Sequence, residues 1–219
     1  MALKTTKQPA QKFGLCLDWE TSGADWGRVS QSIAKYQGLT FGAIVFDATT
    51  FEPVAELYVE IKFNAEKYQW DMGAEKIHGK TREYLEANGV SQEEAATQLA
   101  ELILKYWGPD TPVMFLGHNA EFDINFTAQL LSTIEIEFGK ERADPPKFES
   151  WIRLHHVILD TSPMGFIAFG LYKSDLLFKR VGFEDRGDHN ALQDARQTLE
   201  AAAVVRHMVR IAEAEMAAT

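Results

Sequence analysis

Cysteine is nearly absent from this chain of 219 residues, which contains a single one, Cys16. One thiol cannot form an intrachain disulfide, and it excludes a cysteine-rich zinc site. Cys16 lies in an apolar run beside Leu15 and Leu17, where a buried, unreactive thiol is expected. The lack of disulfides favours a reducing compartment, so we expect a cytoplasmic protein, in the host cytosol if a phage encodes it.

Positive charge is also scarce. The chain has 22 Lys and Arg residues against 32 Asp and Glu, a net charge of −10. Duplex DNA binding through a broad basic face depends on neutralising phosphates with Lys and Arg, so this charge argues against it. An acidic protein that acts on nucleic acid needs another local source of positive charge, and bound metal ions can provide one.

Long apolar runs are missing as well, so neither a signal peptide nor a membrane partner is expected. Residues 1–12 are polar with scattered lysines, and we expect them to form a flexible leader. The composition of the chain, 46% hydrophobic and 25% charged, is that of a globular protein. Its length suits one domain, which we place at residues 13–219.

The hydrophobic pattern predicts an α/β domain with a mixed sheet of five strands flanked by helices. Three β-rich runs come first, as an expected antiparallel meander, and helical and β patterns then alternate. The expected strands are residues 13–18, 39–46, 54–63, 112–117 and 156–160, and the expected helices are 91–106, a segment after Asn119, 175–181 and 190–214. Ser91 and Asn119 are the expected caps of the first two helices.

Two acidic residues, Asp18 and Glu20, follow the first apolar run. In an extended chain they project from the same face, where they can hold one metal ion together. This spacing also arises by chance, and a solvated strand end is the alternative. The position favours a site, because α/β sheets carry their sites at strand ends.

Two further acids, Asp123 and Asp194, are expected in the first turns of helices. An isolated acid there more often only interacts with the helix dipole. His189 precedes Asp194 by five residues and would lie about 140° from it on one helix. The two side chains converge only if His189 is on the loop before the helix, with Asp188 or His189 near the cap. A capping or surface histidine is the alternative to a catalytic base.

Four carboxylates from three strand-to-helix junctions can meet at one edge of the sheet. Hard oxygen ligands of this kind suit two divalent cations, Mg²⁺ or Mn²⁺, which assist phosphodiester hydrolysis. An imidazole titrates near neutrality, so His189 is suited to accept the proton of the attacking water.

Three segments resemble, in their order and spacing, the DEDD superfamily of 3′–5′ exonucleases. The similarity is to its histidine-containing branch (DEDDh, DnaQ-like), which includes proofreading subunits, oligoribonuclease, ribonuclease T and phage exonucleases. The segments are 18–23 (DWETSG), 118–123 (HNAEFD) and 189–194 (HNALQD), and 74–79 (AEKIHG) is similar to a substrate-proximal segment of the same enzymes. The resemblance covers about residues 13–208.

This resemblance implies a ribonuclease-H-like fold and a two-metal site. The residues that it implies as metal ligands are Asp18, Glu20, Asp123 and Asp194, with Asp18 bridging both ions and His189 as general base. The implied reaction is the release of 5′-mononucleotides from a free 3′ end of single-stranded DNA or RNA.

The resemblance also places some residues near the terminal nucleotide. These are the backbone of Thr21, the side chains of His78 and Asn119, and, more weakly, His118. A turn histidine without a substrate contact is the alternative for His78, because Gly79 follows it.

Two other functions are compatible with the same fold. One is a non-catalytic module that binds a polymerase or nucleic acid, which the intact acids and His189 argue against. The other is an endonuclease, since an acidic cluster does not by itself restrict cleavage to ends. The sequence leaves open the choice between DNA and RNA and any polymerase or homodimer partner.

Three further segments are unusual. Residues 22–38 form a longer connection than the compact turn of many relatives, and could cover the substrate or decorate the surface. Residues 162–180 interleave aromatic side chains with cations, which suits base stacking beside phosphates but also core packing. The residues concerned are Phe166, Phe169, Tyr172, Phe178, Lys173, Lys179 and Arg180. Rings of adjacent residues should splay apart on a strand, so His155 and His156 predict no zinc site.

Overall fold

The structure is a computed structural model that describes residues 11–25, 29–108, 111–140, 150–183 and 189–218. Residues 1–10 of the predicted leader and Asp188 lie outside the described residues. The prediction of a single domain over residues 13–219 stays a prediction.

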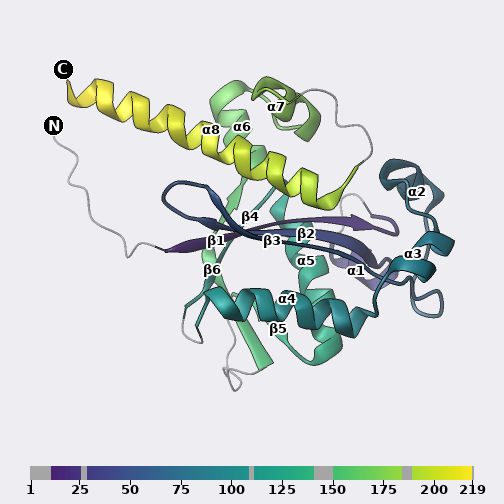
Figure 1. The fold of residues 1–219 in the computed structure, drawn as a ribbon. Helices are drawn as coiled ribbons and strands as arrows, with labels where there is room; N and C mark the ends of the chain where they lie inside the picture. Colours follow the sequence, from purple (N-terminus) through teal and green to yellow (C-terminus); the bar gives the residue numbers. More distant parts are fainter. Residues whose placement is uncertain (1–10, 26–28, 109–110, 141–149, 184–188, 219) are drawn as a thin grey trace.

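The core of the fold is one mixed sheet of six strands in the order β3-β2-β1-β4-β6-β5 (Figure 1). The strands are β1 (Phe13–Thr21), β2 (Gly38–Asp47), β3 (Pro53–Glu60), β4 (Val113–Gly117), β5 (Glu137–Gly139) and β6 (Trp151–Asp160). The first three are antiparallel as predicted, whereas β4 pairs in parallel with β1 and β6, and β5 in parallel with β6. The predicted number of five strands is wrong, because the three-residue strand β5 is too short to give a hydrophobic pattern.

Eight α-helices surround the sheet in the described part of the chain. They are α1 (Val29–Lys35), α2 (Met72–His78), α3 (Arg82–Asn88), α4 (Gln92–Tyr106), α5 (Ala120–Leu131), α6 (Thr161–Phe169), α7 (Ser174–Arg180) and α8 (Ala191–Ala217), and a 3₁₀ turn, η1 (Ser132–Ile134), follows α5. The sequence predicted α4, α5, α7 and α8. The other four have seven or nine residues each, too few for a helical period to stand out.

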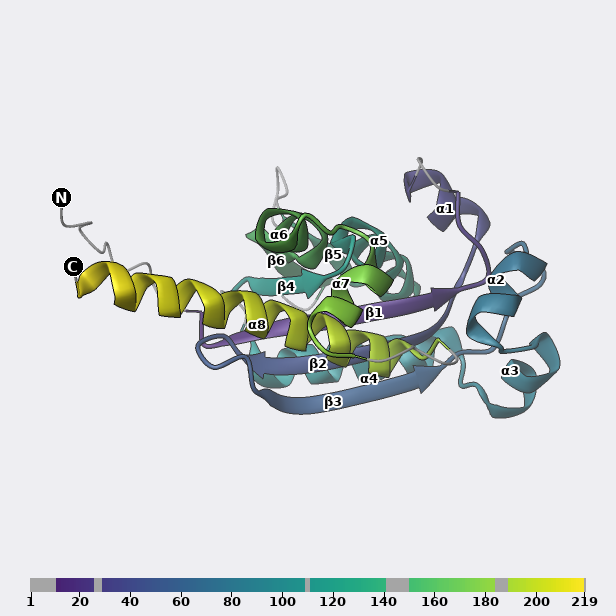
Figure 2. The same ribbon diagram turned by 90° about the horizontal axis from the view of Figure 1, so that it is seen from above.

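Helices cover both faces of the sheet, α8 one face and α4 and α5 the other (Figures 1 and 2). Alternate residues of β1 point to the two faces. Leu17 belongs to the core on the α4 and α5 side, and Cys16 to the core beneath α8. Burying apolar surface on both sides makes β1 the centre of the domain, and its carboxyl end is therefore held in place from both faces.

Two predicted caps have different outcomes. Ser91 caps α4 as predicted, because its hydroxyl accepts a hydrogen bond of 3.1 Å from the backbone N–H of Glu94. Asn119 occupies the cap position of α5, but it adopts the left-handed conformation, with φ of 64°, and its side chain makes no capping hydrogen bond. The prediction that the Asn119 side chain caps this helix is wrong.

Strand β6 is irregular in its middle. Val113 of β4 pairs with Leu154, but Phe115 pairs with Ile158, so β6 has extra residues between these two pairs. The irregularity breaks the alternation of side chains, and the rings of His155 and His156 lie with centroids 4.2 Å apart. The prediction that these rings splay apart is wrong for this reason.

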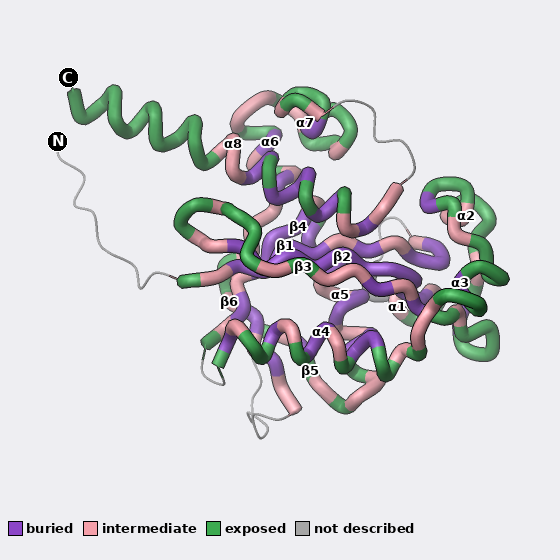
Figure 3. Tube along the Cα trace, in the orientation of Figure 1, coloured by how far each residue is buried: buried purple, intermediate pink, exposed green. Residues whose placement is uncertain are grey.

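Helix α8 changes character along its length. Up to Val205 one side of the helix is buried or half-buried and the exposed residues recur among them, whereas every described residue from Arg206 onward is exposed as the helix extends past the sheet (Figure 3). Within the described ranges, no helix combines the length and the apolar character needed to cross a lipid bilayer.

Candidate active site

A cavity of about 780 Å³ opens at the carboxyl end of β1. It is lined by the end of β1, the starts of α5 and α8, helix α2, and the α6–α7 connection. All nine predicted site residues line it: Asp18, Glu20, Thr21, His78, His118, Asn119, Asp123, His189 and Asp194. Residues that are far apart in the sequence therefore meet in one place, as the spacing predicted.

Strand β1 brings Asp18 and Glu20 to the cavity while it fixes Trp19 in the core. Trp19 is buried, and its indole Nε1 donates a hydrogen bond of 3.1 Å to the hydroxyl of Thr127 on α5. The backbone N–H of Trp19 donates to Asp123 Oδ1, also at 3.1 Å. These two hydrogen bonds hold β1 against α5, so the carboxylates on the two elements keep fixed positions relative to each other.

Asp123 is the most deeply placed of the expected metal ligands. Its side chain is buried, which raises its pKa well above the usual value, and the nearby charges of Asp160 and Glu20 raise it further. The hydrogen bond from the Trp19 backbone acts in the opposite direction. Burial and crowding of acids disfavour the carboxylate, and a cation at this place would offset that cost.

Helix α8 begins beside the same acids. Its cap is Asn190, whose side chain accepts hydrogen bonds of 3.1 and 3.2 Å from the backbone N–H groups of Leu192 and Gln193. His189 directly precedes this cap, so the prediction that it lies near the cap position is confirmed. His189 does lie on the loop before the helix, as predicted, with its Nδ1 at 3.4 Å from Asp194 Oδ2.

A glycine on β2 allows α8 to approach the sheet. Gly42 pairs with Asp18 across the sheet, and a Cβ added there would collide with the backbone of Leu192. Because Gly42 has no side chain, α8 packs close enough to the sheet for Asp194 to reach the acids of β1.

Three side chains form a cluster with the spacing of metal ligands. One ligand atom each from Glu20, His189 and Asp194 lies within 4.8 Å of the other two. Carboxylate oxygens and an imidazole nitrogen are suitable donors for a divalent cation. Asp18 and Asp123 line the same cavity, and the pKa of Asp123 is raised by its burial first and by the nearby charges of Asp160 and Glu20 second. The residues present therefore fit divalent cations.

Asp160 was not singled out from the sequence. Its two carboxylate oxygens accept hydrogen bonds of 3.1 and 3.0 Å from the backbone N–H groups of Asn119 and Ala120, at the start of α5. It also accepts one of 2.8 Å from Ser162 at the start of α6. One side chain caps two helices, and one of these carries Asp123. An acid at the end of the last predicted strand was the signal that could have found it.

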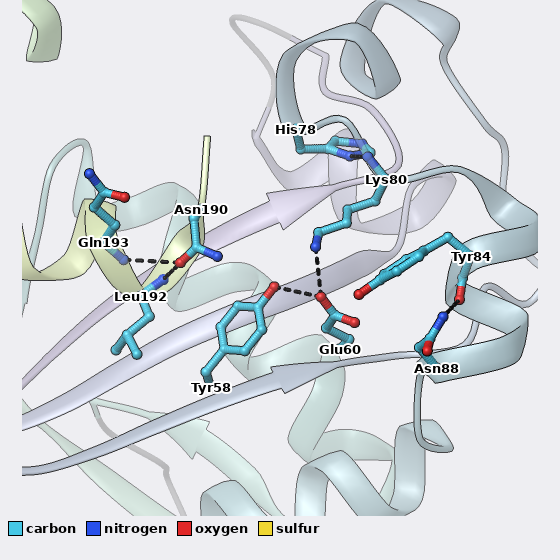
Figure 4. A network of polar contacts seen from close by, with 9 residues as sticks. All are labelled: Tyr58, Glu60, His78, Lys80, Tyr84, Asn88, Asn190, Leu192 and Gln193. Atoms are coloured by element: carbon cyan, nitrogen blue, oxygen red, sulfur yellow. Dashed lines mark hydrogen bonds and ion pairs between the residues drawn. The ribbon is translucent and has the colours of Figure 1, made fainter. Parts of the chain in front are cut away.

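A polar network holds His78 at the wall of the cavity (Figure 4). The backbone N–H of Lys80 donates a hydrogen bond of 3.0 Å to His78 Nδ1, and Lys80 Nζ donates one of 2.8 Å to Glu60 on β3. The Tyr58 hydroxyl donates to the same carboxylate at 2.8 Å. Helix α2 is therefore tied to the sheet directly next to His78.

The network also fixes the tautomer of His78. Burial lowers the pKa of His78 to about 4, so the ring is neutral at physiological pH. Since Nδ1 accepts a hydrogen bond, the proton is on Nε2. That buried N–H has no hydrogen-bond partner among the described residues, so it is a donor that a ligand can satisfy.

The other residues expected near a substrate have contacts of their own. His118 Nδ1 lies 2.9 Å from the hydroxyl of Thr161. The hydroxyl of Thr21 donates a hydrogen bond of 2.9 Å to the carbonyl of Gly23, at the start of the long connection of residues 22–38. Gly23 and Ala24 line the cavity. Trp26 and Arg28 of this connection lie outside the described residues.

Comparison with known proteins identifies relatives at the level of sequence. Residues 15–202 match a family model, RNase_T, described as an exonuclease. The chain is 30% identical over 188 residues to the 3′–5′ DNA exonuclease Cap18 of Escherichia coli, a match that covers 84% of this chain and 86% of Cap18. These matches confirm the resemblance that the three segments predicted.

Solved structures confirm the predicted fold. Exonuclease I of E. coli in complex with a dT13 oligonucleotide superposes with a TM-score of 0.66 and 21% identity, over 90% of this chain. A zinc-bound complex of the same enzyme with single-stranded DNA gives a TM-score of 0.65, also at 21% identity, over 91% of this chain. This chain spans 41% of the length of either exonuclease I chain.

Proposed function

This chain belongs to the RNase_T exonuclease family, and on that premise we propose that it removes 5′-mononucleotides from the 3′ end of single-stranded DNA with two divalent cations. The polarity and the DNA substrate are supported by the similarity to a 3′–5′ DNA exonuclease. The single-stranded form is supported by the complexes of exonuclease I, whose fold this chain shares.

One observation carries the proposal: four carboxylates and a histidine from three separate segments line one cavity. Asp18, Glu20, Asp123 and Asp194 are proposed to hold Mg²⁺ or Mn²⁺, because oxygen ligands suit these hard cations. When bound, such cations supply positive charge to the scissile phosphodiester and lower the pKa of water.

His189 is the proposed general base. The contact of its Nδ1 with Asp194 favours a proton on that nitrogen, which leaves Nε2 as the atom that can accept one. A loop position next to the acids brings the imidazole close to the water that attacks phosphorus.

His78 is proposed to donate a hydrogen bond from Nε2 to an oxygen atom of the 3′-terminal nucleotide. Its neutral state and its unpartnered N–H support that role. Asn119 and the backbone of Thr21 line the same cavity and are proposed to contact the same nucleotide. His118, held beside Thr161, is a weaker candidate.

The decisive experiment compares Mg²⁺-dependent degradation of 3′-blocked and unblocked oligomers, as single and double strands of DNA and RNA. The proposal expects loss of one nucleotide at a time from unblocked single-stranded DNA, and none when the 3′ end is blocked. Asp18→Asn should abolish this activity. Asp47→Asn is the matched control, because Asp47 is the last residue of β2 and does not line the cavity.

Other outcomes identify the alternatives. Internal fragments from a 3′-blocked strand indicate an endonuclease. Binding of single strands without cleavage at any Mg²⁺ or Mn²⁺ concentration indicates a non-catalytic module. Faster release of ribonucleotides would replace DNA by RNA as the substrate, since sugar choice depends on contacts to the 2′ position.

A further inference from the structure

The aromatic and cationic residues of segment 162–180 have different surroundings in the structure. Phe178 is buried in a small core with Leu177 and Ala201, and the Arg180 guanidinium lies over the Phe169 ring at 5.2 Å. These residues have structural contacts. Tyr172 and Lys173 are different, because both are exposed and both line the cavity.

Lys173 is a positive charge on a cavity wall that is otherwise acidic. Among the described residues that line the cavity, six are Asp or Glu and one, Lys173, is Lys or Arg. Its ammonium makes no hydrogen bond or ion pair with any of the described residues. A cation on an otherwise acidic wall is available to an anionic ligand that enters this cavity.

The turn between α6 and α7 presents the two residues in a fixed way. Helix α6 is followed by its cap Gly170, which has a φ of 71° and whose backbone N–H donates a hydrogen bond of 2.9 Å to the carbonyl of Phe166. The carbonyl of Tyr172 accepts a hydrogen bond of 3.2 Å from the hydroxyl of Ser162. Tyr172 as a whole residue is nevertheless 58% exposed. A large aromatic ring held open on an ordered turn can stack on a base.

The position of this turn indicates which part of a strand it would meet. Helix α2, with His78, lies on one side of the start of α8, and α7 lies on the other (Figure 1). The acids that would hold the scissile phosphate line the same cavity as residues of α2 and α7. If the terminal nucleotide occupies the α2 side, the rest of the strand leaves past α7.

We propose that Tyr172 and Lys173 form a contact point for the incoming single strand, 5′ to the scissile phosphate. The Tyr172 ring stacks on a base, and the Lys173 ammonium contacts a backbone phosphate that the metal site does not reach. This inference rests on the proposed function, and it adds a subsite that recognises the strand rather than the terminal nucleotide.

Two substrates distinguish an effect on this subsite from an effect on the catalytic centre. One is an oligo-dT of about twelve nucleotides, within the range of single-strand sites. The other is the p-nitrophenyl ester of thymidine 5′-monophosphate, which has the scissile phosphodiester but no upstream strand. Lys173→Gln should raise KM for the oligomer about tenfold and leave cleavage of the ester unchanged. Lys179→Gln is the matched control, because Lys179 is an exposed lysine in the last turn of α7 and does not line the cavity.

Binding gives a second readout that does not need turnover. With an uncleavable phosphorothioate strand and Ca²⁺, the slope of log Kd against log salt should be shallower by about 0.7 in Lys173→Gln, the value for one phosphate contact on a single strand. Tyr172→Ala should weaken binding about tenfold, and Tyr172→Phe should keep the wild-type affinity, because stacking needs the ring and not the hydroxyl. Thermal unfolding should be unchanged in all four variants.

Each result bears on one of the two proposals. The subsite proposal would be overturned if Lys173→Gln and Lys179→Gln had equal salt slopes. It would also be overturned if Lys173→Gln reduced cleavage of the oligomer and of the ester by the same factor. A wild-type protein that cleaves neither substrate would overturn the proposed function alone. In that case the binding comparison still decides whether Tyr172 and Lys173 hold a strand.

Discussion

Asp123 is a buried carboxylate in surroundings that disfavour its charged form. Burial and the neighbouring acids raise its pKa, so the folded chain keeps a proton on Asp123 at pH values where the unfolded chain has lost it. Stability from this group is therefore present at low pH and decreases as the pH rises from about 4 through the raised pKa. Without cations the residue weakens the fold at neutral pH.

Asp123→Asn tests this balance. The amide can still accept the hydrogen bond from the Trp19 backbone, but it carries no charge. In the presence of a chelator at neutral pH, we expect the variant to unfold at a temperature equal to or higher than the wild type. Addition of Mg²⁺ should raise the unfolding temperature of the wild type more than that of the variant, and activity should fall at least about 100-fold.

Thermal unfolding with and without Mg²⁺, together with a nuclease assay, provides the measurements. A variant that is less stable than the wild type in chelator would show that the charged carboxylate is favourable without metal. That result would contradict the account of Asp123 as a metal ligand maintained at the expense of stability.

For single residues, the sequence predicted the acids of the site but not the contacts that hold the site residues in place. Asp18, Glu20, Asp123 and Asp194 could be named because they follow strands or begin helices. The donor state of His78 could not, because it depends on a hydrogen bond from Lys80, whose side chain is anchored on β3.

Asp160 connects the stability of two helices with the position of the site. Asp160→Ala removes the caps of α5 and α6 together, and each cap contributes about 1 kcal/mol, so we expect a loss of about 2 kcal/mol in the free energy of unfolding. Activity should fall about tenfold or more, because α5 carries Asp123. Urea denaturation and a nuclease assay provide the two measurements.

Ser91→Ala is the control for this prediction. It removes the cap of α4, which does not line the cavity, and should cost about 1 kcal/mol with unchanged activity. If Asp160→Ala lowered stability but left activity at the wild-type level, Asp160 would be a structural cap only.

Gly42 controls the distance between β2 and α8. Gly42→Ala forces the start of α8 away from the sheet, so we expect a stability loss of about 1–3 kcal/mol from overpacking. A shift of about 1 Å in Asp194 should lower activity by roughly 100-fold. Gly139→Ala on β5 is the matched change, because its Cβ would meet no atom within 4 Å. Similar activity in the two variants would contradict the role given to Gly42.

Elements were predictable in proportion to their length and periodicity. The apolar runs of β1, β2 and β4 and the periodicity of α4 and α8 were visible in the sequence, because many residues repeat one pattern. Strand β5 and helix α2 have three and seven residues, and tertiary contacts determine their structure. Their absence from the prediction therefore has a physical cause.

The molecule as a whole is acidic, and we expect this charge to make strand binding dependent on cations. A net charge of −10 and six acids at the cavity repel a nucleic acid backbone. We expect a chelator to weaken binding of an uncleavable single strand by at least about tenfold at 0.15 M salt, where screening acts beyond about 8 Å. Fluorescence anisotropy in Ca²⁺ and in chelator measures this change, and equal affinities would show that the strand is held without cations.

The fold class was predictable because a meander followed by alternating helices and strands allows few arrangements. The strand order was not predicted, and the site depends on it. Since β6 lies next to β4, Asp160 reaches the start of α5 across the sheet edge. Gly42 likewise matters only because α8 packs over β2.

The single thiol makes the molecule convenient for site-specific labelling. Cys16 is buried, and burial together with the charges of Asp18 and Asp123 raises the pKa of its thiol well above the usual value, so maleimide reagents should react with it slowly. A cysteine introduced at exposed position 179 would then be the main target for a fluorophore. Energy transfer from that dye to one on an oligonucleotide would then test, one bound strand at a time, the proposal that single-stranded DNA passes α7.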